Sequence, residues 1–348
     1  MKRLSVLIGV FIFGITACSP TVPVDISAVS TPVSITASVT ATHAPTSTQT
    51  PPPTATPTST PTPTPTSVPS FSFVVTSDMS HYSAAEYIDY PNFFAGLLAY
   101  VQQYGPGDFM VSTGDVIPAE GTDWTIDRVM GEDYPWFPLP GNHDFGSAEI
   151  NFLQNYDLRS QIDNGSMNLN EGPEPCPRTT YSFDYRNAHF VALNVYCDED
   201  APWGIDGKIT DTLYEWLSDD LTETDKEHIF VFGHEPAFPQ PDAQTGDIRH
   251  LNDSLDQYPD ARDRFWQLLR EHNVVAYMNG HTHGYSAVNI DGVWQLDAGQ
   301  AMGVRAAPSP GTFMILDVRG DRVTLQTYRG EEGPGFSFLL FEEVVLKP

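Results

Sequence analysis

The sequence predicts a mixed α/β fold, in which strands alternate with helices and the sheet pairing is mixed or parallel. Short runs rich in Val, Phe, Ile and Tyr recur from Phe71 onward, and each has the length of a strand. Amphipathic patterns typical of helices lie between some of these runs, at residues 93–104, 212–221 and 261–272. Because ligands bind at the carboxyl ends of strands in such sheets, the residues that follow the runs are candidates for a functional site.

The first 17 residues are typical of a secretory signal peptide. Lys2 and Arg3 precede an apolar stretch that is too short for a typical membrane-spanning helix. Residues 15–18, Ile-Thr-Ala-Cys, resemble the bacterial lipobox, and this resemblance implies that Cys18 becomes a lipidated first residue. Ordinary signal cleavage nearby is the alternative. We therefore expect an extracytoplasmic protein that is anchored to the cell membrane or envelope through the lipid on Cys18.

Residues 18–70 are predicted to form a disordered stalk. No charged residue occurs between Asp25 and Asp78, and the stretch is rich in Thr, Pro and Ser. Proline fixes φ and removes a backbone donor, so no packed core forms here. A polyproline-like segment over residues 44–70 would extend roughly 80 Å at about 3.1 Å per residue. We therefore assign the folded domain to residues 71–348.

Composition narrows the class of partner. The chain has 348 residues and a formal net charge of −28 at pH 7. Binding to the backbone of a nucleic acid rests on Lys and Arg, so this charge argues against a nucleic-acid partner. A small phosphorylated substrate stays compatible with the charge, because metal ions offset negative charge locally. The oligomeric state is left open by the sequence.

Two cysteines, Cys176 and Cys197, lie in the predicted domain. In an exported protein, two such residues are expected to form one disulfide. Two buried free thiols are the alternative.

Five of the apolar runs end at a side chain that can bind a metal ion. The runs are residues 71–77, 108–114, 136–141, 228–233 and 274–280, followed by Asp78, Asp115, Asn142, His234 and His281, with His283 two residues further on. A glycine stands directly before the polar residue in four of the five, which lets the chain turn sharply with little bulk near a ligand. Two aspartates, an asparagine and three histidines exceed the needs of one tetrahedral ion and suit two ions that share a carboxylate.

Residues 141–144, Gly-Asn-His-Asp, have two interpretations by themselves. Gly and Asn favour turns, so a polar turn is one of them. A metal site with a catalytic histidine is the other. The remaining motifs favour the second interpretation, because they place further metal-binding side chains at the same expected edge of the sheet.

Taken together, these motifs resemble the calcineurin-like metallophosphoesterase superfamily. The matching residues are Asp78, Gly114-Asp115, Gly141-Asn142-His143-Asp144, Gly233-His234 and Gly280-His281-Thr282-His283. The resemblance covers roughly residues 71–300 and implies a four-layer sandwich of two mixed β-sheets flanked by α-helices. The C-terminal part agrees, with an Asp-Gly turn in residues 288–296, a hairpin over 312–330 and a last strand over 337–346.

The resemblance also implies an activity, metal-dependent hydrolysis of phosphate monoesters or diesters, and a role for each matched residue. Two ions, Fe, Mn or Zn, would share Asp115; one would be held by Asp78 and His283, the other by Asn142, His234 and His281. His143 would protonate the leaving oxygen, and Asp144 would hold and support its imidazole. A cationic His143 beside two ions suits general acid catalysis on an anionic ester.

The first motif departs from the family pattern. Many members have Asp-x-His there, but Ser80 stands where that histidine would be, and Pro118 stands where the branch resembling purple acid phosphatases has a tyrosine. His81, Ser80 or water would then complete the first ion's ligands, and His81 as an ordinary loop residue is the alternative. This departure favours a second hypothesis, a surface binding module without turnover. The complete second set of ligands and His143 favour the enzyme.

Overall fold

The computed structural model describes residues 68, 70–79, 93–158, 169–197, 206–301, 309–331 and 337–348. Cys18, His81 and the predicted signal peptide and stalk lie outside the described residues, apart from Val68 and Ser70 at the end of the stalk. Among the described residues, no helix has both the length and the apolar character that a membrane crossing requires.

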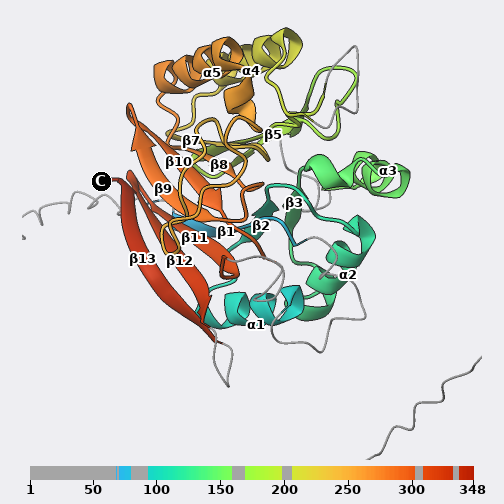
Figure 1. The fold of residues 1–348 in the computed structure, drawn as a ribbon, viewed down its shortest axis with the longest axis vertical. Helices are drawn as coiled ribbons and strands as arrows, with labels where there is room; N and C mark the ends of the chain where they lie inside the picture. The colour runs from blue at the N-terminus through green and yellow to red at the C-terminus, as the bar shows by residue number, and fades with distance from the viewer. Residues whose placement is uncertain are drawn as a thin grey trace, which may run out of the picture. The chain divides into compact units, whose positions relative to one another are not determined.

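Two mixed sheets form the centre of the domain (Figure 1). The six-stranded sheet has the order β13-β12-β11-β1-β2-β3, with strands Ser337–Lys347, Arg322–Glu331, Thr312–Arg319, Ser70–Thr76, Phe109–Ser112 and Trp136–Pro138. The seven-stranded sheet has the order β4-β5-β6-β7-β8-β10-β9, with strands Leu169–Glu171, Tyr181–Tyr185, Ala188–Ala192, His228–Phe232, Ala276–Asn279, Val293–Ala298 and Tyr285–Ile290. Strands β1, β2 and β3 are parallel, as are β6, β7, β8 and β10.

Successive side chains of the strands contribute alternately to a core between the two sheets and to a core between a sheet and its helices. In β1, Phe73 faces the other sheet and packs on Phe190 and Phe230, with ring centroids 5.1 Å away in both cases. Val74, one residue later, belongs instead to the cluster formed with the helices. Successive side chains of a strand point to opposite faces, so strands that are apolar on both faces are covered on both.

Helices cover the outer face of each sheet and complete four layers (Figure 1). Helices α1 (Phe94–Tyr104), α2 (Ala119–Met130) and α3 (Ser147–Asn155) pack on the six-stranded sheet, and α4 (Asp211–Glu223) and α5 (Pro259–Glu271) pack on the seven-stranded sheet. The predicted four-layer sandwich is therefore confirmed, as are the helices expected near residues 93–104, 212–221 and 261–272. Helix α2 was not predicted, because Thr122 and Thr125 occupy two of its four buried positions and a glycine lies in its first turn.

The predicted C-terminal hairpins and the disulfide are also present. Strands β9 and β10 pair antiparallel around Asp291 and Gly292, which both have the positive φ that a tight hairpin turn requires. Strands β11, β12 and β13 pair antiparallel in sequence. Cys176 and Cys197 form a disulfide with a Cα–Cα distance of 6.0 Å. It joins two turns near the end of β6, next to Tyr196, whose ring contacts Phe145.

Candidate metal centre

The polar residues that follow the parallel strands of both sheets lie together. Asp78, Asp115 and Asn142 follow β1, β2 and β3 of one sheet, and His234 and His281 follow β7 and β8 of the other. A hydrogen bond from the backbone N–H of His281 to Asp78 Oδ2 (2.9 Å) joins the two groups. The carboxyl ends of strands from two sheets thus meet at one place, which explains why residues 203 positions apart are neighbours.

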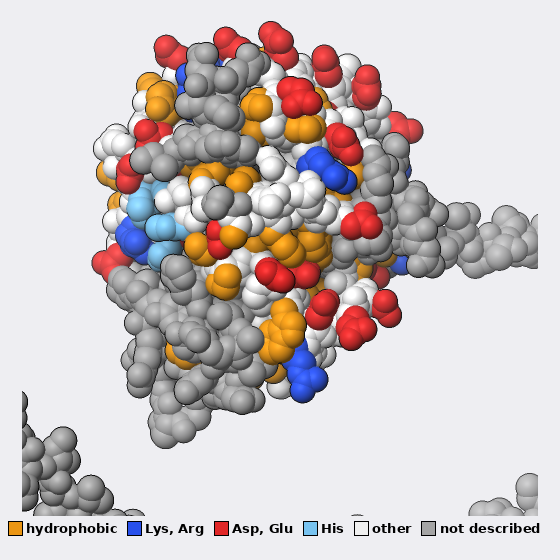
Figure 2. All heavy atoms as spheres, turned by 90° about the vertical axis from the view of Figure 1, so that its right-hand side faces the viewer, with side chains coloured by type: hydrophobic (Ala, Val, Ile, Leu, Met, Phe, Trp, Pro, Cys, Tyr) orange, Lys and Arg blue, Asp and Glu red, His pale blue; other side chains and the backbone are white. Residues whose placement is uncertain are grey.

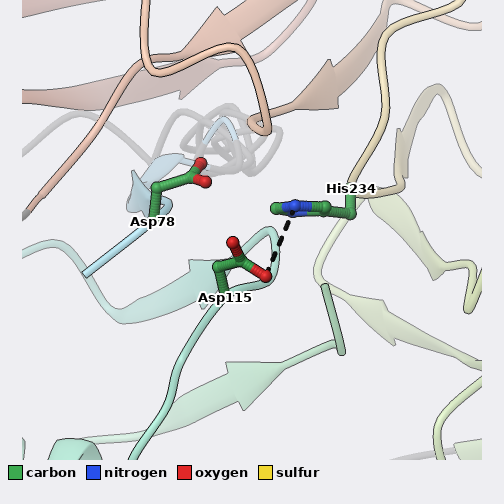
Figure 3. A group of neighbouring side chains, drawn as sticks. All are labelled: Asp78, Asp115 and His234. Atoms are coloured by element: carbon green, nitrogen blue, oxygen red, sulfur yellow. Dashed lines mark ion pairs between the residues drawn. The ribbon is translucent and has the colours of Figure 1, made fainter. Parts of the chain in front are cut away.

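Asp78, Asp115 and His234 form the centre of this group (Figure 3). All three are buried, and one ligand atom from each lies within 4.8 Å of the others. His234 Nε2 is 3.6 Å from Asp115 Oδ1. Carboxylate and imidazole are common ligands of transition metals, so these residues could hold an ion.

The protonation of two histidines points to the same conclusion. His234 Nδ1 donates to the carbonyl oxygen of Thr113 (2.8 Å), and His281 Nε2 donates to that of Asp253 (3.2 Å). Burial lowers the pKa of both imidazoles, that of His281 to about 2, so each is neutral and carries only that one proton. The other ring nitrogens, His234 Nε2 and His281 Nδ1, each lie 3.2 Å from Asn142 Oδ1.

Three lone pairs therefore face one another without a proton between them. Neither nitrogen can donate to Asn142 Oδ1 in this state. Such an arrangement is unfavourable in a buried place unless a cation lies among the three atoms. The donor set, two imidazoles, an amide oxygen and the nearby Asp115, therefore fits a transition-metal ion.

The two aspartates have opposite pKa shifts. Burial raises the pKa of Asp78, but His283, whose Nε2 lies 3.3 Å from Asp78 Oδ1, and a hydrogen bond from Ser77 (2.6 Å) outweigh this effect and lower it. Burial and the negative charge of Asp78 raise the pKa of Asp115 to about 7. Two carboxylates this close in a buried place favour a bound cation, because it lowers the cost of ionising both.

Four of the predicted ligands have positive φ angles themselves. The angles are 51° at Asp78, 54° at Asp115, 70° at His281 and 60° at His283. Residues other than glycine adopt this conformation at a cost, and such positions cluster at functional sites. The sharp turns expected of the preceding glycines are therefore made largely by the ligand residues.

The glycines that precede the predicted ligands mainly leave space for neighbouring residues to approach the backbone closely. A Cβ atom on Gly141 would overlap Asp115, and one on Gly280 would overlap the side chains of Ser77 and Asp78. Among the glycines that directly precede a predicted ligand, Gly114 also has a positive φ itself, 108°. The glycines thus allow the strand ends of the two sheets to touch.

His143 lies at the surface of the group. Its backbone N–H donates to Asp115 Oδ1 (2.9 Å), while its side chain is 63% exposed and its Nε2 is 4.0 Å from Asp115 Oδ2. The backbone contact anchors the residue, and the imidazole remains accessible to a ligand from solvent. Figure 2 shows histidine atoms gathered at the left edge of one face of the molecule, beside Lys or Arg atoms.

Asp144 is placed differently from its expected position beside the imidazole of His143. It is fully buried, and its Oδ2 accepts the backbone N–H groups of Gly141 (2.8 Å) and Val116 (3.1 Å). Within the described parts of the chain, no hydrogen bond or ion pair joins Asp144 to the His143 side chain. Its carboxylate therefore holds the Gly141–Asp144 turn against the segment after β2.

Sequence reasoning missed His250 and Asp253. The His250 ring lies over that of His281, with centroids 4.0 Å apart, and its Nδ1 is 3.2 Å from Asp253 Oδ2. The carbonyl of Asp253 in turn accepts from His281. Both residues lie in the long loop between β7 and α5, where no strand-end pattern marks them.

Two known proteins resemble this chain, one in sequence and one in fold. An acid phosphatase from Aspergillus ficuum is 24% identical to the chain, in a match that covers 43% of this chain and 33% of that protein. The chain thus spans about a third of the length of this relative. The solved structure of PhoD has a TM-score of 0.56 at 13% identity, covering 80% of this chain and 70% of that one, which is a likeness in fold.

A family model supplies the assignment. The model for calcineurin-like phosphoesterases matches residues 71–285, which is more than half of the chain and includes every residue of the group described above. The matched region begins with β1 and ends at the start of β9. This chain therefore belongs to the calcineurin-like phosphoesterase family.

Proposed function

We propose that this chain hydrolyses phosphate esters at a pair of metal ions held between its two sheets. The observation that carries the proposal is that His234 Nε2 and His281 Nδ1 both lie 3.2 Å from Asn142 Oδ1, while the opposite nitrogen of each ring faces a backbone carbonyl oxygen. A purely structural polar cluster would instead pair each acceptor with a donor.

The residues divide into two ligand sets. Asn142, His234 and His281 would hold one ion and Asp78 and His283 the other, with Asp115 shared between them. The 3.3 Å approach of His283 Nε2 to Asp78 Oδ1 supports the set formed by these two residues. When bound, such ions neutralise a phosphoester and acidify a water molecule. Fe, Mn and Zn all suit these ligands, and His81 remains a candidate to complete the set of Asp78 and His283.

His143 would act as the general acid. Its imidazole is exposed, and its backbone N–H bonds to the shared Asp115, so a substrate between imidazole and ligands would lie within its reach. A proton on this ring would pass to the departing ester oxygen. Asp144 would serve by fixing the turn that carries His143, through the N–H groups of Gly141 and Val116.

Metal analysis of His281→Ala and of the wild type tests the proposal. Wild-type protein is expected to bind two ions per chain and to release nitrophenol from a nitrophenyl phosphate monoester or from the corresponding diester. His281→Ala should lose metal and turnover together, whereas His272→Ala, at the end of α5, should keep both. Wild-type protein that binds no metal would refute the proposal, and would imply that the Asn142 amide nitrogen donates to both imidazoles.

A phosphomonoester is the first substrate class to test. The match to an acid phosphatase supports it, although that match covers only a third of the relative. Comparing kcat/KM for the monoester and the diester separates the two classes. A higher value for the diester would assign the chain to phosphodiesterases.

We also propose that the enzyme acts outside the cytoplasm, on a stalk tethered by lipid at Cys18. The lipobox-like residues 15–18 and the uncharged Thr/Pro-rich segment support this location. Wild-type protein is expected to fractionate with membranes, and Cys18→Ala is expected to release it or to mislocalise it. A wild-type protein that is wholly soluble, with an unmodified N-terminus, would contradict the tether.

A further inference from the structure

A buried ion pair joins the loop after β7 to the opposite sheet. Arg329, on β12, donates through Nη1 and Nη2 to Asp242 Oδ1 (3.1 Å) and Oδ2 (2.7 Å). The two residues are only 2% and 3% exposed. Removing two charges from water is costly, and an apolar pair of similar size is often as stable. A gain in folding stability is therefore a weak explanation for this pair.

The carboxylate of Asp242 binds the segment that carries two predicted ligands, residues 280–285, here named the histidine loop. Asp242 Oδ2 accepts the backbone N–H of Tyr285 (2.8 Å), two residues after His283. The next residue, Ala243, donates its N–H to the carbonyl of Tyr285 (2.8 Å). A Cβ on Gly284 would lie 3.1 Å from that of Asp242, so the two segments are in direct contact.

The same stretch of chain reaches the other side of the histidine loop. At its far end, the carbonyl of Asp253 accepts from His281 Nε2, and the ring of His250 lies over that of His281. Residues 242–253 thus contact the histidine loop near both ends. Arg329, which lies on the six-stranded sheet, binds Asp242, the first residue of this stretch, through both of its Nη atoms.

We propose that the Arg329–Asp242 pair is a positioning device for the metal centre, which holds His281 and His283 in the geometry that binds metal. The inference rests on the proposed function, because it takes both histidines to be ligands. Both have positive φ, a conformation that persists only where surrounding structure fixes it. Metal affinity depends on how well the ligands are held before binding, so loosening the histidine loop should weaken it.

A planar fork is what this role requires. Both Arg329 Nη atoms bond to separate oxygens of Asp242 and orient the carboxylate toward Tyr285. The backbone N–H groups of Gln244 (2.9 Å) and Thr245 (2.7 Å) also bond to Oδ1, within the same loop. The guanidinium also lies near the rings of Tyr285 and Phe341, 5.7 and 5.4 Å from their centroids. Lysine keeps the charge but cannot form the two parallel bonds, so Arg329→Lys separates orientation from charge.

Titration of the metal-free full chain with Mn²⁺ tests the proposal. We expect Arg329→Met to weaken Mn²⁺ binding at least tenfold, and Arg329→Lys to weaken it by less. Asp220→Asn is the matched control, because this buried carboxylate also pairs with a basic side chain, His189 (2.9 Å) on β6. It further accepts from Ser182 (2.6 Å) and Asn170 (2.8 Å), which lie outside the centre. At a similar loss of Tm, the control should keep the Mn²⁺ affinity of the wild type.

His283→Ala, measured in the same titration, separates the two proposals. Suppose that His283→Ala weakens Mn²⁺ binding but Arg329→Met binds Mn²⁺ like the wild type. The positioning role is then wrong, and the proposed function stands. If Arg329→Met fails to fold, Arg329→Lys takes its place in this comparison. If His283→Ala binds Mn²⁺ like the wild type, the ligand set of the proposed function is wrong. Equal loss of affinity in Asp220→Asn and Arg329→Met would also overturn the positioning role, since both would reflect stability alone.

Discussion

His189, on β6, should make the stability of this protein fall at alkaline pH. Its Nδ1 is 2.8 Å from Asp184 Oδ1 and its Nε2 is 2.9 Å from Asp220 Oδ2. Burial lowers the pKa of the imidazole, but hydrogen bonds and charge interactions with the two carboxylates outweigh this effect and raise it from 6.5 to about 9. The folded chain therefore holds the His189 proton more tightly than the unfolded chain does.

The size and sign of the effect follow from this difference. At about 1.4 kcal/mol per pKa unit, a rise from 6.5 to about 9 corresponds to at most about 3.5 kcal/mol, of which about 3 kcal/mol is lost between pH 6 and pH 9.5. Because the folded pKa is the higher one, this contribution is complete below pH 6.5 and is lost as the pH rises through 9. The pKa of Asp184 is lowered, so this carboxylate stays ionised throughout that window and adds no slope.

Urea unfolding at pH 6 and pH 9.5 measures the effect. The wild type should lose about 3 kcal/mol more between the two pH values than His189→Gln, which keeps an amide donor but cannot be protonated. Metal binding also depends on pH, but it is common to both proteins and cancels in the comparison. Equal losses in the two proteins would refute the reasoning, because His189 would then not be held as a cation.

Four further outcomes are expected. His143→Ala should keep its metals, since the hydrogen bond of His143 to Asp115 comes from its backbone N–H. Its rate should fall roughly 100- to 10,000-fold on an alkyl phosphate but less on a nitrophenyl phosphate, whose leaving group needs less protonation. Equal losses of rate on both substrates, with reduced metal content, would make His143 a ligand. His234→Ala should abolish turnover and lower the metal content measured by elemental analysis, and normal metal stoichiometry would show that the assignment is wrong. Gly280→Ala should bind Mn²⁺ more weakly than Gly131→Ala, because a Cβ at Gly280 overlaps Ser77 and Asp78, whereas nothing lies near Gly131 at the end of α2. Matching affinities would contradict this. Replacing both Cys176 and Cys197 by Ser, which opens a crosslink across 21 residues, should cost about 3 kcal/mol of unfolding free energy, and an unchanged urea midpoint would argue against that contribution.

Local patterns made much of the fold predictable. The strand that leads to Asp78 and the helix over residues 94–104 have the periodicities of their final structures, and the Asp291-Gly292 turn is marked by its residue types. Helix α2 and the short strand β4 (Leu169–Glu171) were not predictable in this way. Their residues carry weak patterns, and contacts with distant elements decide their conformation.

The sequence by itself determined the family resemblance and the candidate ligands from Asp78 to His283, because both depend on residue types at fixed spacings. It also indicated the disulfide, because Cys176 and Cys197 are the two cysteines of the predicted domain. Only the tertiary structure decided how those residues interact. It placed Asp144 on backbone N–H groups rather than on His143, brought His250 over His281, and closed the Arg329–Asp242 pair between the two sheets. These contacts join segments that are tens of residues apart, so their partners are set by how the two sheets pack together, which no local pattern of residues encodes.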